Sequence, residues 1–145
     1  MTSGYYGTSI NSHPHGGTPN HIIEQLTQEF GDLFDPCPNN PTFDGLKLDW
    51  NTICLVGSYN AVFVNPPYTK GEIKNWVKKA YEESKKGITV IMLIPPYTDT
   101  IYFHDYIYHK AELRFIKGRL KFKGYDNKSA SFPSMLVIWS CDNAN

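Results

Sequence analysis

The chain has 145 residues, of which 41% are hydrophobic and 19% are charged, and its basic and acidic side chains balance to a formal net charge of zero. These values predict one globular domain with a sizeable core, and they exclude a disordered or fibrous chain. They also argue against binding of a polyanion by the whole surface, and no apolar run approaches the roughly 20 residues that span a bilayer.

The N-terminal segment, residues 1–17, has neither the basic start nor the apolar stretch of a signal peptide. We therefore expect no membrane association and a cytoplasmic protein, located in the host cell if its source is viral. The segment is rich in Gly, Ser, Thr, His and Tyr and has no apolar period. This composition predicts a flexible N-terminal arm in front of a single domain, residues 18–145.

Residue types that bind metals are present, but they are not arranged as a site. Cys37, Cys54 and Cys141 are an odd number with wide spacing, which fits neither a disulfide framework nor a zinc site and predicts reduced thiols. His13 and His15 lie in the arm beside Gly and Pro and are interpreted as linker residues. We therefore expect no metal.

The first element after the arm is predicted to be a helix. Thr18 is expected to be its N-cap and Pro19 its first helical residue. Apolar residues follow at helical spacing as far as Phe30, and Gly31 ends the run. Residues 32–35 predict a short strand that stops at Pro36, and residues 37–51 consist mostly of turn formers.

A strand, a helix and a second strand are predicted next. Residues 61–64 and 88–94 are continuous apolar runs, as in strands that are buried on both faces. Residues 71–86 between them carry an apolar stripe at helical spacing and are followed by Gly87, which is expected to cap the helix. This order predicts a crossover unit of a parallel sheet.

The C-terminal third predicts a third helix over residues 100–110 and two strands, 113–122 and 133–139, joined by a polar loop. The His104 and His109 side chains are expected on a helix surface. The predicted fold class is therefore α/β, with a mostly parallel sheet and an antiparallel element at its C-terminal edge.

The segment Asn65-Pro66-Pro67-Tyr68 follows the first of the buried strands directly. In open α/β sheets, ligands bind beyond the carboxyl ends of the strands. The amino group of adenine is a poor nucleophile because its lone pair is delocalised into the ring. The side-chain carbonyl of Asn65 and the main-chain carbonyl of Pro66 can both accept hydrogen bonds from this group and draw its nitrogen towards a tetrahedral geometry.

The two prolines fix the loop, and Tyr68 offers a flat face on which an extruded base can stack. A simple proline-rich turn is the alternative interpretation. The position between a buried strand and an amphipathic helix favours a catalytic segment. Ile94-Pro95-Pro96-Tyr97 ends the next strand with the same frame but has Ile in place of the amide, so we expect it to be structural and to form a wall of the pocket.

A locally basic stretch lies between residues 110 and 128. It contains Glu112 and Asp126 together with the basic residues Lys110, Arg114, Lys117, Arg119, Lys121, Lys123 and Lys128. Aromatic residues are interleaved with these charges, which suits a groove that follows phosphates and stacks bases. A solvated face is the alternative. We favour phosphate contacts by Arg119 and Lys121 and stacking by the adjacent Phe122.

From about Thr18 to Trp139 the sequence resembles the phage-type Dam family of DNA N6-adenine methyltransferases. The residues that carry the resemblance occur in the family's order: Thr18-Pro19, Phe34-Asp35-Pro36-Cys37, Asp44-Gly45-Leu46, Asn65-Pro66-Pro67-Tyr68, Gly118-Arg119-Leu120-Lys121-Phe122, and Ser129-Ala130-Ser131-Phe132-Pro133-Ser134. The resemblance implies a compact Rossmann-like methyltransferase fold that uses S-adenosylmethionine. It implies a catalytic role for residues 65–68, and it implies cofactor binding by Thr18, Pro19, Asp35, Pro36, Asp44 and Asn65.

The resemblance further implies methyl transfer to the N6 amino group of adenine in DNA. The same motif would also serve cytosine N4, adenine in RNA or a glutamine amide of a protein, and a catalytically silent nucleic-acid-binding subunit is a further alternative. The chain has no separate recognition domain. We therefore expect target recognition from loops, from the arm, or from a second protomer or partner subunit.

Overall fold

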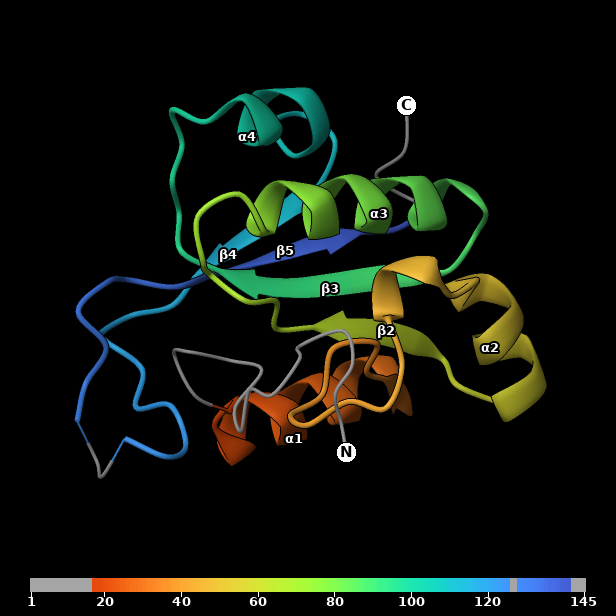
Figure 1. Cartoon of the computed structure of the whole chain (residues 1–145), viewed down its shortest axis with the longest axis horizontal. Coiled ribbons are helices and arrows are strands. Elements are labelled where there is room, and N and C mark those ends of the chain that lie inside the picture. Colours follow the sequence, from red (N-terminus) through yellow and green to blue (C-terminus); the bar gives the residue numbers. More distant parts are fainter. Residues whose placement is uncertain (1–16, 126–127, 142–145) are drawn as a thin grey trace.

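The computed structural model describes residues 17–125 and 128–141 (Figure 1). Helices and strands alternate along most of the chain. Their bounds are α1 Asn20–Phe30, β1 Leu33–Phe34, the 3-10 helix η1 Gly45–Lys47, α2 Trp50–Gly57, β2 Ala61–Val64, α3 Ile73–Lys85, β3 Thr89–Ile94, α4 Ile101–Tyr106, β4 Glu112–Phe115 and β5 Met135–Trp139.

The strands form one five-stranded sheet in the order β1-β2-β3-β5-β4. β1, β2 and β3 are parallel, with Phe34 opposite Val62 and Val64 opposite Met92. β5 runs antiparallel to both of its neighbours, β3 and β4. The prediction of an α/β fold with a mostly parallel sheet and an antiparallel element at its C-terminal edge is confirmed, since β5 pairs antiparallel with the edge strand β4.

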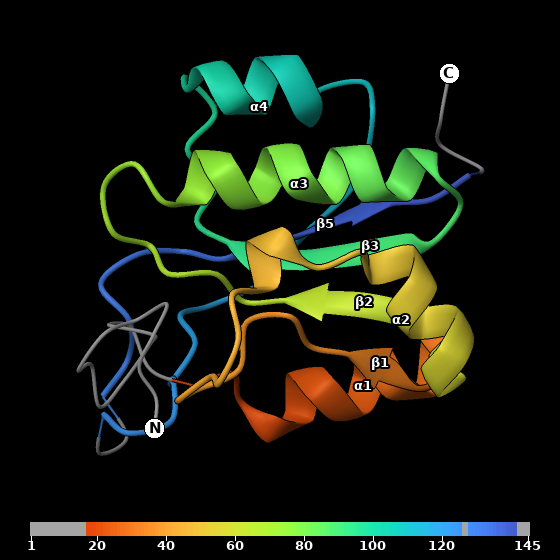
Figure 2. The ribbon, with the colours of Figure 1, turned by 45° about the vertical axis from the view of Figure 1, so that its right-hand side comes forward.

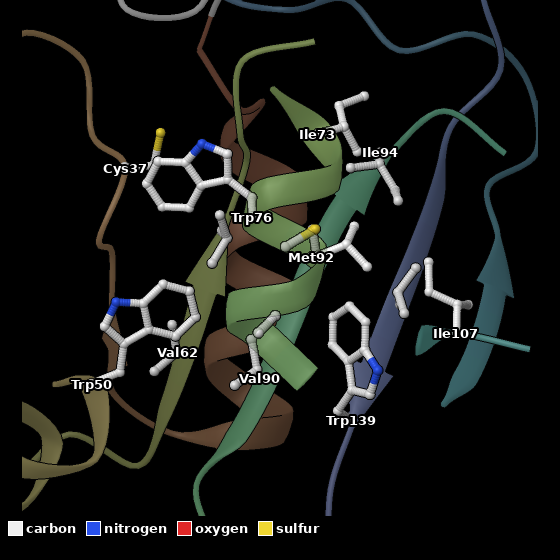
Figure 3. Close-up of a cluster of buried hydrophobic side chains, with 14 of the residues drawn as sticks. Cys37, Trp50, Val62, Ile73, Trp76, Val90, Met92, Ile94, Ile107 and Trp139 are labelled. Atoms are coloured by element: carbon white, nitrogen blue, oxygen red, sulfur yellow. The ribbon is translucent and has the colours of Figure 1, made fainter. Parts of the chain in front are cut away.

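Two apolar cores lie on the two faces of the sheet, because successive strand residues point to opposite faces. Alternate residues of β2, β3 and β5, among them Val62, Met92 and Trp139, join the core on the face covered by α3 and α4 (Figure 3). The intervening residues of the same strands join the core under α1. Figure 1 shows the resulting layers, with α3 and α4 on one side of the sheet and α1 on the other.

The buried carboxylate of Glu83 ties α2 to α3. Its Oε1 accepts from the backbone and side-chain amides of Asn51 at 3.1 and 2.8 Å, and its Oε2 accepts from Lys79 and Lys86 at 2.9 and 3.1 Å. Burial alone would raise the pKa of Glu83, but these hydrogen bonds outweigh it and hold the pKa below its usual value. Glu83 therefore stays ionised at neutral pH and fixes the segment that leads into β2.

Several predicted boundaries are wrong. The N-cap of α1 is Pro19, not Thr18, and no side chain caps this helix. Helix α2 was not predicted. The predicted helix 100–110 is regular only over α4, with Ile107 as its C-cap, and His109 beyond the cap has φ of 63°. His104 and His109 are both exposed, as expected, although only His104 lies on the helix.

The predicted strand 113–122 ends at Phe115, and a turn at Gly118, with φ of 80°, follows it. Helix α3 ends at Lys85 and is capped by Lys86, so Gly87, the predicted cap, lies one residue beyond the observed cap. Among the described residues, no helix has the length and apolar character that crossing a membrane requires. The predicted arm lies outside the described residues, except for Gly17, which is buried.

Candidate active site

The candidate catalytic segment lies at the edge of the sheet where the parallel strands end. Asn65 follows β2 directly, Asp35 follows the neighbouring β1, and Pro95 follows β3. In Figure 2 the arrow of β2 points towards the side on which the chain between β4 and β5 loops out. Adjacent parallel strands thus bring the ends of β1, β2 and β3 together, at the edge where ligands bind in open α/β sheets.

The side-chain amide of Asn65 is buried and has a hydrogen-bond partner at each end. Asn65 is 3% exposed, and its Nδ2 donates to Oγ1 of Thr18 at 2.9 Å. Its Oδ1 accepts from the hydroxyl of Tyr68 at 2.9 Å. An amide oxygen can accept two hydrogen bonds, so the bond from Tyr68 does not by itself prevent Oδ1 from accepting another.

The hydroxyl of Tyr68 lies between two acceptors. It is 2.9 Å from Oδ1 of Asn65 and 2.8 Å from the backbone carbonyl oxygen of Leu93 in β3. A hydroxyl has one proton, so Tyr68 donates to one of these oxygens at a time. Burial, with a smaller contribution from Tyr97, raises the pKa of Tyr68 well above its usual value. Tyr68 therefore remains a hydrogen-bond donor at neutral pH.

The ring of Tyr68 is part of an aromatic cluster. Its centroid lies 5.5 Å from that of Phe132 and 6.3 Å from that of Phe122, with interplanar angles of 74° and 85°. Both are the edge-to-face arrangements that aromatic pairs prefer. Phe122 itself is only 4% exposed and belongs to the core under α1. Phe122 therefore supports Tyr68 from behind and presents little of its own surface to solvent.

A pocket of about 310 Å³ adjoins this cluster. It is lined by Phe122, Tyr125 and residues 128–132, and most of the lining is apolar. Phe122 and Phe132 thus contact Tyr68 and also line the pocket. The aromatic walls and the hydroxyls of Ser129 and Ser131 form a surface on which a planar heterocycle can stack and donate or accept hydrogen bonds.

Asp35 directly follows β1, the strand next to β2 in the sheet. Solvent reaches Asp35, although protein atoms surround its carboxyl group on most sides. This burial raises its pKa to about 6, and a hydrogen bond from the backbone N–H of Cys37, at 2.8 Å, opposes the shift. A carboxyl group with this pKa is suited to pair with a cationic group of a ligand, since pairing would compensate for its loss of hydration.

The loop after β1 is held in a fixed shape. Gly45 packs so closely against the backbone carbonyl of Pro36 that a side chain at this position would collide with it. The carbonyl oxygen of Gly45 accepts from Nε1 of Trp50 at 2.8 Å. Asp44 accepts from the backbone N–H of Leu46 and caps η1, so its turn-forming role is present whether or not it contacts a ligand.

In the basic stretch, exposed basic residues alternate with buried apolar residues. Lys117, Arg119, Lys121 and Lys123 are exposed, whereas Leu120 and Phe122 are buried in the core under α1. Arg114 differs from the other basic residues of the stretch. It forms two hydrogen bonds with the Glu29 carboxylate, at 2.6 and 2.7 Å, and one with Glu112. The exposed cations near the aromatic pocket therefore belong to residues 117–128.

A family model described as DNA N-6-adenine-methyltransferase (Dam) matches residues 14–143 of the chain. The chain belongs to the Dam family. Its five-stranded mixed sheet is that of a Rossmann-like methyltransferase, as the sequence resemblance implied. Methyltransferases of the Dam family generally use S-adenosylmethionine, and DNA is the substrate that the family name gives. A search of the curated proteins found no match.

The structure brings some of the predicted Dam site residues together and separates others. Thr18, Asn65 and Tyr68 are joined by hydrogen bonds, and Tyr68 contacts Phe122. Pro19, Pro36, Pro66 and Pro67 are buried and shape the backbone around them. Arg119 and Lys121 lie outside this hydrogen-bonded group. Among the described residues, no cluster of three or more metal-binding side chains was found.

Sequence reasoning missed two partners of the candidate catalytic segment, residues 65–68. The bond between Thr18 and Asn65 joins residues that are 47 positions apart, and no local pattern signals it. The carbonyl oxygen of Leu93 is a main-chain group and has no signal in the sequence. Phe132 was identifiable, because it lies in a segment that resembles the family, but its contact with Tyr68 depends on the fold.

Proposed function

We propose that this chain transfers a methyl group from S-adenosylmethionine to the N6 amino group of adenine in DNA. The observation that carries the proposal is the buried amide of Asn65, held at the carboxyl end of β2 in a chain of the Dam family. A preorganised acceptor in a site with little water acts strongly on a reacting amino group, because it does not need to reorient during the reaction.

The proposed mechanism assigns three tasks to residues 65–68. Oδ1 of Asn65 and the carbonyl oxygen of Pro66 accept from the two N–H bonds of the adenine amino group and direct its lone pair away from the ring. The ring of Tyr68 stacks on the extruded base. The hydroxyl of Tyr68 anchors its ring to β3 through Leu93. When bound, S-adenosylmethionine would supply an electrophilic methyl group to the amino nitrogen: the S–CH3 bond would break to leave the neutral thioether, and the amino group would release one proton.

We propose that the cofactor lies along the ends of β1 and β2. Asp35 fits the cationic amino group of the methionine moiety, since its carboxyl group is largely surrounded by protein and gains by pairing with a cation. Pro36 and Asp44 belong to the rigid loop beside it. Thr18 and Pro19 lie directly before α1 and border the proposed site, where Thr18 accepts a hydrogen bond from Asn65. Asn65 lies between this region and the acceptor base, which suits a residue shared by both sites.

We propose that DNA binds on the side of the aromatic pocket. Arg119 and Lys121 are exposed there and can neutralise phosphates, which positions the strand without reading its sequence. Phe122 supports the stacking surface of Tyr68 from within the core. Recognition of the target sequence is proposed to come from the loop of residues 117–132, from the arm, or from a second protomer or partner subunit.

The first prediction tests the catalytic role of Asn65. Asn65→Ala should reduce methylation of DNA on the order of 100-fold or more, because it removes one preorganised group at the reacting centre. Cofactor affinity, measured by calorimetry, should change far less than turnover, because the main task of Asn65 is at the acceptor amino group. The control is Asn75→Ala, which changes an exposed asparagine of α3, and thermal unfolding shows whether each variant is folded. Near-normal turnover of folded Asn65→Ala would remove Asn65 from the mechanism.

The second prediction concerns Asp35. A cation beside this carboxyl group lowers its pKa, so binding of S-adenosylmethionine should displace its proton. Because the pKa is about 6, close to half a proton should be released per cofactor at pH 6, and less as the pH rises to 7. Cofactor affinity should therefore increase with pH over this range.

Calorimetry in buffers of different ionisation enthalpy measures the protons released. Asp35→Asn should abolish the release and weaken cofactor binding, whereas Asp32→Asn, at the opposite end of β1, should do neither. Unchanged affinity and unchanged proton release in Asp35→Asn would place the cofactor elsewhere.

The third prediction concerns the exposed cations. Each phosphate contact adds about 0.9 to the slope of log affinity against log salt concentration, so the double variant Arg119→Gln, Lys121→Gln should flatten this slope by nearly two. Lys74→Gln with Lys78→Gln is the matched control, since both lysines are exposed on α3, across the sheet from α1. A wild-type slope in the first variant and a flattened slope in the control would move the DNA surface to the α3 side.

A further inference from the structure

The backbone is hydrogen-bonded on both sides of Thr18. Its neighbour Gly17 exchanges two backbone hydrogen bonds with Lys123, at 3.1 and 2.8 Å. On the other side, the backbone carbonyl of Pro19 accepts from the first turn of α1, and the proline ring restricts the backbone there. The backbone on both sides of Thr18 is therefore held in place, and the Thr18 hydroxyl lies 2.9 Å from Nδ2 of Asn65.

The orientation of the Asn65 amide decides what it can do. One end of the group accepts hydrogen bonds and the other end donates, so a rotation by half a turn would replace the acceptor with a donor. The adenine amino group brings N–H donors and needs the acceptor. The plane of the amide must therefore be set before the base arrives.

The hydroxyl of Tyr68 can donate to this amide or to another acceptor, whereas the hydroxyl of Thr18 can accept from the amide in either case. The single proton of Tyr68 can be given to Asn65 or to the carbonyl oxygen of Leu93. When it is given to Leu93, Tyr68 no longer donates to Oδ1. The bond from Nδ2 to Thr18 is compatible with both states, so it can hold the amide plane throughout.

We propose that Thr18 is a positioning residue for methyl transfer. Its hydroxyl accepts from Nδ2 of Asn65 and thereby keeps Oδ1 directed towards the acceptor amino group. The proposal rests on the proposed function, and it gives the Thr18 hydroxyl a task distinct from contact with the cofactor. Because Gly17 is bridged to Lys123, the segment that carries Arg119 and Lys121 also supports this position.

The test compares Thr18→Val, which keeps the shape of the side chain but loses the hydroxyl, with Thr18→Ser, which keeps the hydroxyl. At saturating cofactor and DNA, Thr18→Val should lower kcat about tenfold, as for loss of one hydrogen bond to a polar group, and Thr18→Ser should restore most of it. KM for DNA and the cofactor affinity should change less than about twofold. Thr27→Val, on the exposed face of α1, is the matched control.

A double-variant comparison separates positioning from cofactor contact. If Thr18 acts through Asn65, Thr18→Val should cause little further loss in the Asn65→Ala background, since residues that act as a unit are not additive. Weakened cofactor binding with wild-type kcat in Thr18→Val would overturn the proposal and assign the hydroxyl to the cofactor. Full additivity of the two changes would overturn it as well.

A measurement without catalysis keeps this test independent of the proposed function. The side-chain amide signals of Asn65, identified by their loss in Asn65→Asp, are observed by NMR in isotope-labelled protein. In the wild type they should be protected from exchange with solvent, and Thr18→Val should shift them and remove the protection, whereas Thr18→Ser should not. If the wild type transfers no methyl group, the proposed function fails while these signals still report on the bond. Unaltered Asn65 signals in Thr18→Val would overturn the positioning role.

Discussion

The candidate site depends on one constraint: a polar amide is buried where two apolar parallel strands end. Val64 and its neighbours in β3 are fully buried, so the polar groups that follow them must be satisfied by hydrogen bonds within the protein. Asn65 meets this requirement through Thr18 and Tyr68, and Tyr68 meets it through Asn65 and Leu93. The need to satisfy buried groups thus orders the candidate catalytic segment before any substrate binds.

The residues on the two sides of Asn65 differ in charge and polarity, and each side suits a different kind of ligand. On the side of β1, Asp35 provides a carboxyl group whose pKa is raised to about 6 by burial, which suits a cation. On the other side, Phe122, Phe132 and Tyr125 provide aromatic surface, and exposed basic residues lie in the same segment. A single buried amide between a carboxylate and an aromatic pocket is consistent with transfer of a group from a charged donor to a planar acceptor.

Local sequence signals predicted β2, β3 and α3 closely, because continuous apolar runs and a helical stripe specify these elements without distant contacts. Helix α2 was missed because its residues include Thr52, Ile53 and Val56, whose β-branched side chains favour helices little, and because contacts with Glu83 fix its start. The alternation around Leu120 and Phe122 resembles a strand, but among the described residues this segment forms no ladder: Lys123 makes an isolated bridge with Gly17, and Leu120 accepts one backbone bond from Ala130. Residues 65–68 were predicted as the catalytic segment from their place after β2, whereas the bond to Thr18 required the fold.

The identity of the methylated product tests the central claim most directly. The protein is incubated with S-adenosylmethionine carrying a labelled methyl group and unmethylated DNA of mixed sequence, and the DNA is then digested to nucleosides for mass spectrometry. We expect labelled N6-methyladenine, in an amount that falls on the order of 100-fold in Asn65→Ala. Label in cytosine, label found only in RNA or protein supplied in parallel, or no label from a protein that binds the cofactor would contradict it.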